Sequence, residues 1–169
     1  MSANPTKLNT FQRLALTTSI IEPIKSGIHS TLNQIGQIQC EFQKEFFEEN
    51  WQPESKISVF INFNQDEKPH QVRIHFENNA ALQILEKLTG EMAPEDSAEL
   101  LDGVGEISNM IYGLIKTNLK SQGIQFSMSR PEAQWTKDLL EKVKDIPHTS
   151  LIIPFKMFNG QCYFEYLSW

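Results

Sequence analysis

Hydrophobic residues first recur at a helical spacing. Apolar side chains every three or four positions predict a helix over residues 20–35 with one buried face. Its apolar members are Ile21, Ile24, Ile28, Leu32 and Ile35. Pro23 suits the first turn of this helix, where its missing N–H costs little, and Gly36 suits its end. Two outcomes stay open for residues 1–19: a frayed N-terminal extension, or further turns of the same helix.

The spacing then changes to strict alternation. Apolar and polar residues alternate over 37–47, 57–63 and 71–77, which predicts three β-strands. A period of two places apolar side chains on one face, so we expect an antiparallel sheet with one buried and one wetter face. The polar segment 64–69 predicts a hairpin loop. Phe60, on the polar side of its strand, indicates a second layer or a subunit contact there.

The remaining pattern is mixed. Helices are predicted over about 79–89, after residues 96–99 to about Gln122, and near 132–144, with a strand at 124–129. Asp96 to Glu99 has the pattern of a capping box before the long helix. The dipeptide Asn159-Gly160 predicts the turn of a final hairpin between strands 150–158 and 161–167.

The length of 169 residues suits one domain, which we expect over residues 20–169. Its predicted class is α+β, with an antiparallel sheet of about six strands packed against long helices. A net charge of −6 argues against a nucleic-acid partner and against a membrane surface. The N-terminal residues lack a secretion-signal pattern, so we expect a cytoplasmic protein. Cys40 and Cys162 are expected to be free, buried thiols.

Residues 102–113 of the long helix carry the candidate chemistry. At about 100° per residue, one side of this helix forms a buried stripe. The stripe consists of Val104, Ile107, Ile111, Leu114 and Ile115. Asp102, Glu106 and Asn109 lie on nearly the opposite side, followed one turn later by Gly113. A mid-helix glycine costs about 1 kcal/mol relative to alanine, so a bare surface there suits the close approach of another backbone.

This segment resembles the signature of the CheC/CheX family of chemotaxis phosphatases. The match is Asp102-x-x-x-Glu106-x-x-Asn109, extended through Gly113. A single motif copy is similar to the CheX branch, because CheC carries two. The resemblance implies a CheC/CheX-like fold and a hydrolase of two-component signalling. Such an enzyme removes the phosphoryl group from the aspartyl phosphate of a CheY-type response regulator.

The resemblance also implies residue roles and partners. Asn109 would orient the attacking water, and Glu106 would pair with a lysine of the receiver domain. Asp102 matches the acidic or serine position that opens the motif. Gly113 and Lys116 complete the expected partner-binding face, where Lys116 would offset repulsion between two acidic proteins. The chain would need no cofactor of its own, because Mg²⁺ is expected in the receiver, and it would form a homodimer through its sheet.

Two alternatives stay open. Besides the enzyme, the chain could be a receiver-binding scaffold of the same fold without turnover, and the third reading is a purely structural dimer. Asn109 favours the enzyme, because docking alone does not require an amide, and a structural dimer leaves Gly113 unexplained. The last strand is expected to form a sheet edge that a second subunit would cover. Four dispersed histidines predict no metal site; they are His29, His70, His75 and His148.

Overall fold

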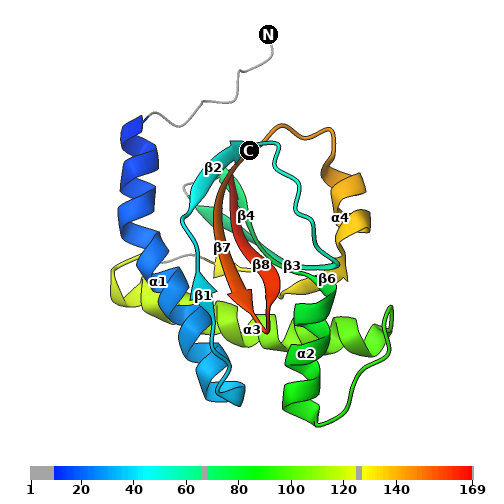
Figure 1. Ribbon diagram of the computed structural model, residues 1–169. Helices are drawn as coiled ribbons and strands as arrows, with labels where there is room; N and C mark the ends of the chain where they lie inside the picture. Colours follow the sequence, from blue (N-terminus) through cyan, green and yellow to red (C-terminus); the bar gives the residue numbers. More distant parts are fainter. Residues whose placement is uncertain (1–9, 66–67, 125–126, 169) are drawn as a thin grey trace.

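The computed structural model describes residues 10–65, 68–124 and 127–168, which form one antiparallel sheet and helices on both of its sides (Figure 1). The helices are α1 (Thr10–Gly36), α2 (Asn78–Thr89), α3 (Ala98–Ser121) and α4 (Thr136–Val143). The first four strands are β1 (Glu41–Phe42), β2 (Phe46–Glu49), β3 (Ile57–Gln65) and β4 (Lys68–Phe76). The others are β5 (Ser127–Met128), β6 (Glu132–Trp135), β7 (Thr149–Met157) and β8 (Gly160–Ser168).

The sheet has the order β1-β7-β8-β4-β3-β5, with β2 also paired to β7 and β6 also paired to β3. Every pairing is antiparallel, which confirms the predicted α+β class. The prediction that the last strand forms an edge is wrong, because β8 lies between β7 and β4. The short strands β1, β2, β5 and β6 form the edges instead.

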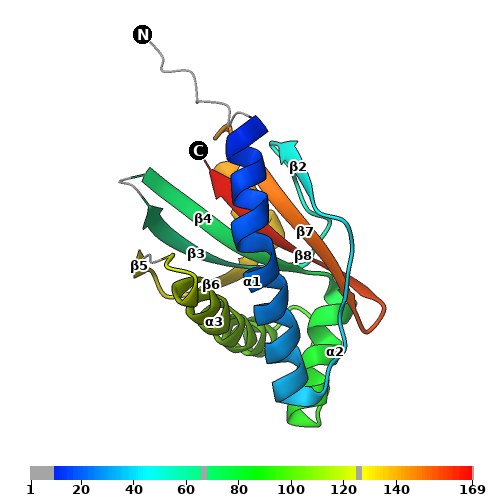
Figure 2. The same ribbon diagram turned by 90° about the vertical axis from the view of Figure 1, so that its left-hand side faces the viewer.

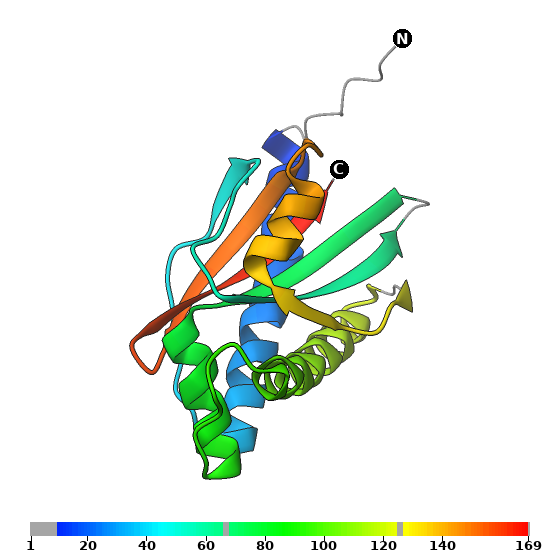
Figure 3. The same cartoon turned by 90° about the vertical axis from the view of Figure 1, so that its right-hand side faces the viewer.

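Three helices share one face of the sheet. Figure 2 shows α1 in front of the strands with α3 beside it, whereas Figure 3, from the opposite side, shows α4 in front. The inward residues of α1, α2 and α3 join those of β3, β4, β7 and β8 in one hydrophobic core. The face predicted as apolar from alternation is therefore the face that α1 to α3 cover.

Helix α1 is longer than predicted. It begins at Thr10 rather than near residue 20, so residues 10–19 belong to the helix. Pro23 therefore lies inside the helix and not in its first turn. An interior proline removes one donor from the helical ladder, and the burial of α1 against α3 outweighs that loss. The side-chain amide of Asn118 in α3 donates to the carbonyl of Pro23 over 3.2 Å.

Strand boundaries differ from the predictions at three places. Segment 37–47 forms two short strands, because β1 and β2 pair separately with β7. Pairing of β3 with β4 extends into the expected 64–69 loop and reaches Gln65 and Lys68, while residues 66–67 lie outside the described residues. The helix predicted over 132–144 begins only at Thr136, because residues 132–135 pair with β3 as β6. Short edge strands of this kind depend on partners that are distant in sequence.

The strand predicted at 124–129 is described only in part. Its paired residues are Ser127 and Met128 of β5, and residues 125–126 lie outside the described part of the chain. The predicted helix over 79–89 is confirmed as α2, and the long predicted helix is confirmed as α3.

The final hairpin forms where predicted, but its turn is shifted by one residue. Met157 pairs with Gly160, so the two turn residues are Phe158 and Asn159, at φ values of 51° and 62°. Two left-handed residues are typical of the tight turn that suits twisted strands. A side chain at Gly160 would place its Cβ 2.8 Å from Cβ of Ala80, so this glycine allows β8 to pack closely on α2.

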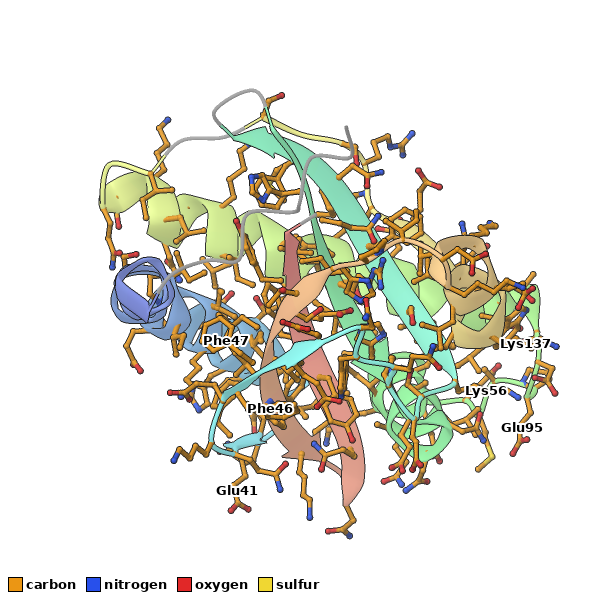
Figure 4. All side chains as sticks on the ribbon, turned by 90° about the horizontal axis from the view of Figure 1, so that it is seen from above. Glu41, Phe46, Phe47, Lys56, Glu95 and Lys137 are labelled. Carbon is orange, nitrogen blue, oxygen red and sulfur yellow. The ribbon has the colours of Figure 1, made fainter. Side chains whose placement is uncertain are left out.

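The second face of the sheet is polar but not wet, which corrects the expected wetter face. Arg73, His75 and Glu165 have no exposed surface there. A second layer made of α4 and the chain before β3 covers them, and Figure 4 shows Lys137 of α4 near Lys56, the residue just before β3. Phe60 is buried within this layer. Of the two explanations predicted for Phe60, a second layer or a subunit contact, the structure shows the second layer.

Candidate functional site

Helix α3 is held firmly at its start and along one side. Ser97 caps the helix, because its hydroxyl accepts a hydrogen bond from the backbone N–H of Leu100 over 3.1 Å. The buried Tyr112 hydroxyl donates to the carbonyl of Val59 in β3 over 2.7 Å. The predicted apolar stripe is buried apart from Leu114, which is partly exposed. The rotation of α3 about its axis is therefore fixed by the core.

This rotation turns the three polar motif residues toward solvent. Asp102, Glu106 and Asn109 are all exposed. Among the described residues, none of these side chains has a hydrogen-bond or ion-pair partner. An unpartnered carboxylate and an unpartnered amide, one turn apart on a rigid helix, are available to a second molecule. Met110, next to Asn109, is 50% exposed and adds apolar contact surface.

A groove runs along this face of α3. It has a volume of about 560 Å³, and the strand β6 with the segment before it forms its second wall. From α3 it is lined by Ala98, Leu101, Asp102, Gly105, Glu106 and Asn109, and from the second wall by Ser129, Arg130, Pro131 and Ala133. The structure therefore brings the three polar motif residues together in one open cleft.

Sequence reasoning missed the second wall of this groove. Ser129 and Arg130 follow Asn109 by 20 and 21 residues in the sequence, and only the pairing of β5 and β6 with β3 returns them to α3. The adjacent Arg130-Pro131 dipeptide predicts an extended or turn segment, which is a weak signal. No spacing rule connects it to Glu106.

Gly113 and Lys116 lie outside the groove lining but on exposed surface of α3. A Cβ atom at Gly113 would meet nothing within 4 Å, so no contact inside this chain requires glycine there. Gly103 differs, because its Cβ would lie 2.5 Å from a methyl carbon of Leu85. Packing within the described residues therefore leaves Gly113 unexplained, and it also leaves room at Gly105, whose Cβ would lie 3.5 Å from Cβ of Ala133.

A second cluster has the residue types of a hydrolytic triad. The Ser58 hydroxyl lies 2.7 Å from Nδ1 of His75, and Nε2 of His75 lies 2.9 Å from the Glu165 carboxylate. Ser58, His75 and Glu165 are completely buried, and Ser58 also contacts Thr136 of α4 over 2.8 Å. A nucleophile needs access to its substrate. We therefore assign this cluster to the packing of the second layer.

The electrostatics of this cluster favour a neutral histidine and an ionised glutamate. Burial lowers the pKa of His75 below its ordinary value. Burial alone would raise the pKa of Glu165, but hydrogen bonds from His75 and Ser150, together with the charge of Arg73, lower it. With Glu165 ionised, Nε2 of His75 donates to the carboxylate and Nδ1 accepts from Ser58.

The other candidates from the sequence do not form a site within the described residues. Burial raises the pKa of Cys40 to about 11 and also raises that of Cys162, and both thiols are unpaired. In that part of the chain no group of three or more potential ligands is placed to hold a metal ion. No helix there has the length and apolar character needed to cross a membrane.

Comparison with known proteins gives a consistent picture. A sequence profile described as "Chemotaxis phosphatase CheX" matches residues 57–156, which is more than half of the chain. No curated protein sequence matches the chain. Among solved structures, the chemotaxis protein CheX from Vibrio vulnificus is similar with a TM-score of 0.72 and 22% identity, over 87% of this chain and 97% of that one.

Two further solved structures share the fold. A CheC-like superfamily protein from Shewanella sp. PV-4 has a TM-score of 0.73 and 23% identity, over 88% of this chain and 96% of that one. The CheX–CheY–BeF₃–Mg²⁺ complex from Borrelia burgdorferi has a TM-score of 0.67 and 21% identity, over 87% of this chain and 96% of that one. At these identities the likeness establishes the fold that carries the groove.

Proposed function

Because the chain belongs to the CheX family of chemotaxis phosphatases, we propose that it removes the phosphoryl group from the aspartyl phosphate of a CheY-type response regulator. The observation that carries this proposal is the pair Glu106 and Asn109, exposed and unpartnered within the described residues on the groove side of α3. A similar fold occurs in the Borrelia burgdorferi complex of CheX with CheY, BeF₃ and Mg²⁺.

Asn109 has the chemistry to position water. An aspartyl phosphate is an activated acyl phosphate, and its hydrolysis needs a water molecule held in line with the phosphorus–oxygen bond that breaks. The water oxygen forms the new bond to phosphorus, and the aspartate carboxylate leaves with the electron pair. A carboxamide accepts one hydrogen bond and donates another while remaining neutral. Asn109 therefore orients the water without repelling the phosphoryl oxygens.

Glu106 has the chemistry to fix the docking. Its exposed carboxylate, one turn before Asn109, forms a charge-assisted hydrogen bond with an ammonium group of the receiver. Such a bond fixes the depth to which the amide enters the phosphorylated pocket. Asp102, one turn earlier in the same groove, extends the acidic edge. The receiver holds the Mg²⁺ that stabilises transferring charge, and the phosphatase supplies position alone.

The test is a phosphate-release assay with a phosphorylated CheY-type receiver from the same organism. Asn109→Ala should abolish the acceleration with little loss of docking, whereas Glu106→Ala should also weaken docking, by about tenfold for one lost charge-assisted bond. Lys156→Gln, at the one exposed position of the otherwise mostly buried strand β7, is the control for a surface change away from the groove. Docking of the parent protein without any acceleration would instead identify a receiver-binding scaffold. Parental activity in both α3 variants would overturn the assigned roles.

The homodimer and the cytoplasmic location belong to the same proposal. A receiver substrate is a cytoplasmic partner, so we place the phosphatase in that compartment.

A dimer through the sheet would have to use an edge other than β8. The edge strand β2 carries Phe46, which is 36% exposed, and this favours the β2 edge. Sedimentation equilibrium of the full chain tests the dimer, and a monomer at high protein concentration would exclude it.

A further inference from the structure

The second wall of the groove carries a cation, Arg130, which the motif does not include. We infer that Arg130 is a docking residue that binds an acidic group of the receiver while Glu106 binds its lysine. This inference rests on the proposed function and names a specificity determinant of the same site. It gives the groove two opposite charges on two walls, so that a partner must present the complementary pair.

Arg130 is available for such a contact. Its side chain is exposed and has no ion-pair partner among the described residues, although two carboxylates line the same groove. Two other cations of the fold, by contrast, are paired with carboxylates. Lys25 lies 3.1 Å from Glu45, and Lys56 lies 2.5 Å from Asp96. The guanidinium of Arg130 therefore loses no internal ion pair when a partner binds it.

The backbone presents Arg130 at a fixed place. The N–H of Ser129 donates to the carbonyl of Asn62 in β3 over 2.9 Å, and the N–H of Asn62 donates back to the Ser129 hydroxyl over 3.1 Å. The same hydroxyl donates to the carbonyl of Arg130 over 3.1 Å. Pro131 restricts the backbone immediately after Arg130. A contact residue in a short connection between two paired strands, tied to the sheet in this way, loses less freedom on binding than one on a long loop.

The charge balance indicates an acidic partner group. The chain has a net charge of −6, and two of its carboxylates, Asp102 and Glu106, lie on the motif wall of the groove. A receiver pocket that binds Mg²⁺ is built from carboxylates, because hard cations take oxygen ligands. Two acidic surfaces repel at long range. An arginine beside the motif offsets this repulsion and can bind a carboxylate through two parallel hydrogen bonds.

The experiment separates docking from chemistry. Binding of a CheY-type receiver activated with beryllofluoride and Mg²⁺ is measured for the parent, Arg130→Lys, Arg130→Gln and Arg130→Glu, with Lys156→Gln as the matched control for one lost surface cation. We expect Kd to rise by about tenfold in Arg130→Gln, more in Arg130→Glu and less in Arg130→Lys. The KM for the phosphorylated receiver should rise in parallel while kcat at saturation stays unchanged. The dependence of Kd on salt concentration should weaken only in the Gln and Glu variants of Arg130.

Two results would overturn the inference. One is an unchanged Kd and KM in Arg130→Gln, and the other is a fall in kcat without a rise in KM, which would assign Arg130 to the phosphoryl group instead. Failure of the proposed function is a different result. In that case the parent protein neither binds the activated receiver nor accelerates phosphate loss, whatever residue stands at position 130.

Discussion

Two sets of polar residues in this protein have opposite environments. The set on α3, Asp102, Glu106 and Asn109, is exposed and has no partner within the described residues. The set on the second face of the sheet, centred on His75 and Glu165, is completely buried and joined by hydrogen bonds of 2.5 to 2.9 Å. By residue type alone, the buried set has the more familiar catalytic composition, a serine, a histidine and a glutamate.

The difference teaches that access decides which set is available to a second molecule. Buried polar groups must satisfy one another, because an unpaired buried group costs the desolvation free energy. Once Glu165 has bound His75, Arg73 and Ser150, it has little capacity left for a substrate. The α3 set carries no such internal contacts within the described residues. The comparison predicts that changes in the buried set alter stability, whereas changes in the α3 set alter turnover.

The largest expected effect is on stability. Glu165→Ala leaves the buried guanidinium of Arg73 without its carboxylate, and breaking one partner of a buried pair costs about 3–5 kcal/mol. Chemical denaturation should show this loss in the free energy of unfolding. Phosphatase activity per folded molecule should stay at the parental level. A Glu165→Ala protein of parental stability would mean that the cluster does not hold the second layer.

The next effect is on turnover alone. Asn109→Asp keeps the shape of the side chain but removes its N–H donors and adds a negative charge facing the phosphoryl group. We expect kcat to fall by at least about 100-fold, the size of effect seen when one well-placed polar group is lost from an active site. The free energy of unfolding should change by less than about 0.5 kcal/mol, because the residue is exposed. A large loss of stability would contradict the comparison.

The buried set should also make stability depend on pH. The pKa of His75 is lower in the folded protein than its ordinary value, so the unfolded chain binds a proton first as the pH falls. Stability is therefore retained above about pH 6.5 and lost below it, at up to about 1.4 kcal/mol per pH unit. The lowered pKa of Glu165 adds a further loss at more acidic pH. His75→Gln should reduce the change in the free energy of unfolding between pH 6.5 and 5.5. An unchanged slope would mean that other groups cause the pH dependence.

The smallest expected effect concerns Gly113, on the exposed surface of α3. Gly113→Ala has open space for its Cβ, so the helix should gain about 0.5–1 kcal/mol in stability. If Gly113 allows a receiver backbone to approach, the same change should raise the Kd for the activated receiver by a few-fold. Gly103→Ala is the contrasting control, because its Cβ would clash with Leu85 and destabilise the fold. Tighter receiver binding by Gly113→Ala would remove the argument for close approach at this position.

Local pattern predicted much of this molecule. The 3.6-residue period placed α2 and α3, and alternation placed β3 and β4, because an amphipathic element shows its buried face in its own sequence. The outward direction of Glu106 and Asn109 followed from the same period. The family resemblance added their proposed roles. These features depend on residues within about two turns of one another.

Contacts between distant segments decided the rest. Residues 132–135 became a strand because β3 offered a partner, and β8 became central because it pairs on both sides. The polar face of the sheet became buried because α4 and Trp51 cover it. Arg130 came to line the same groove as Glu106 for the same reason, since only the folded sheet joins the two walls of the groove. A periodic pattern records which side of an element avoids water, but not which distant element covers it, and that choice is made by packing.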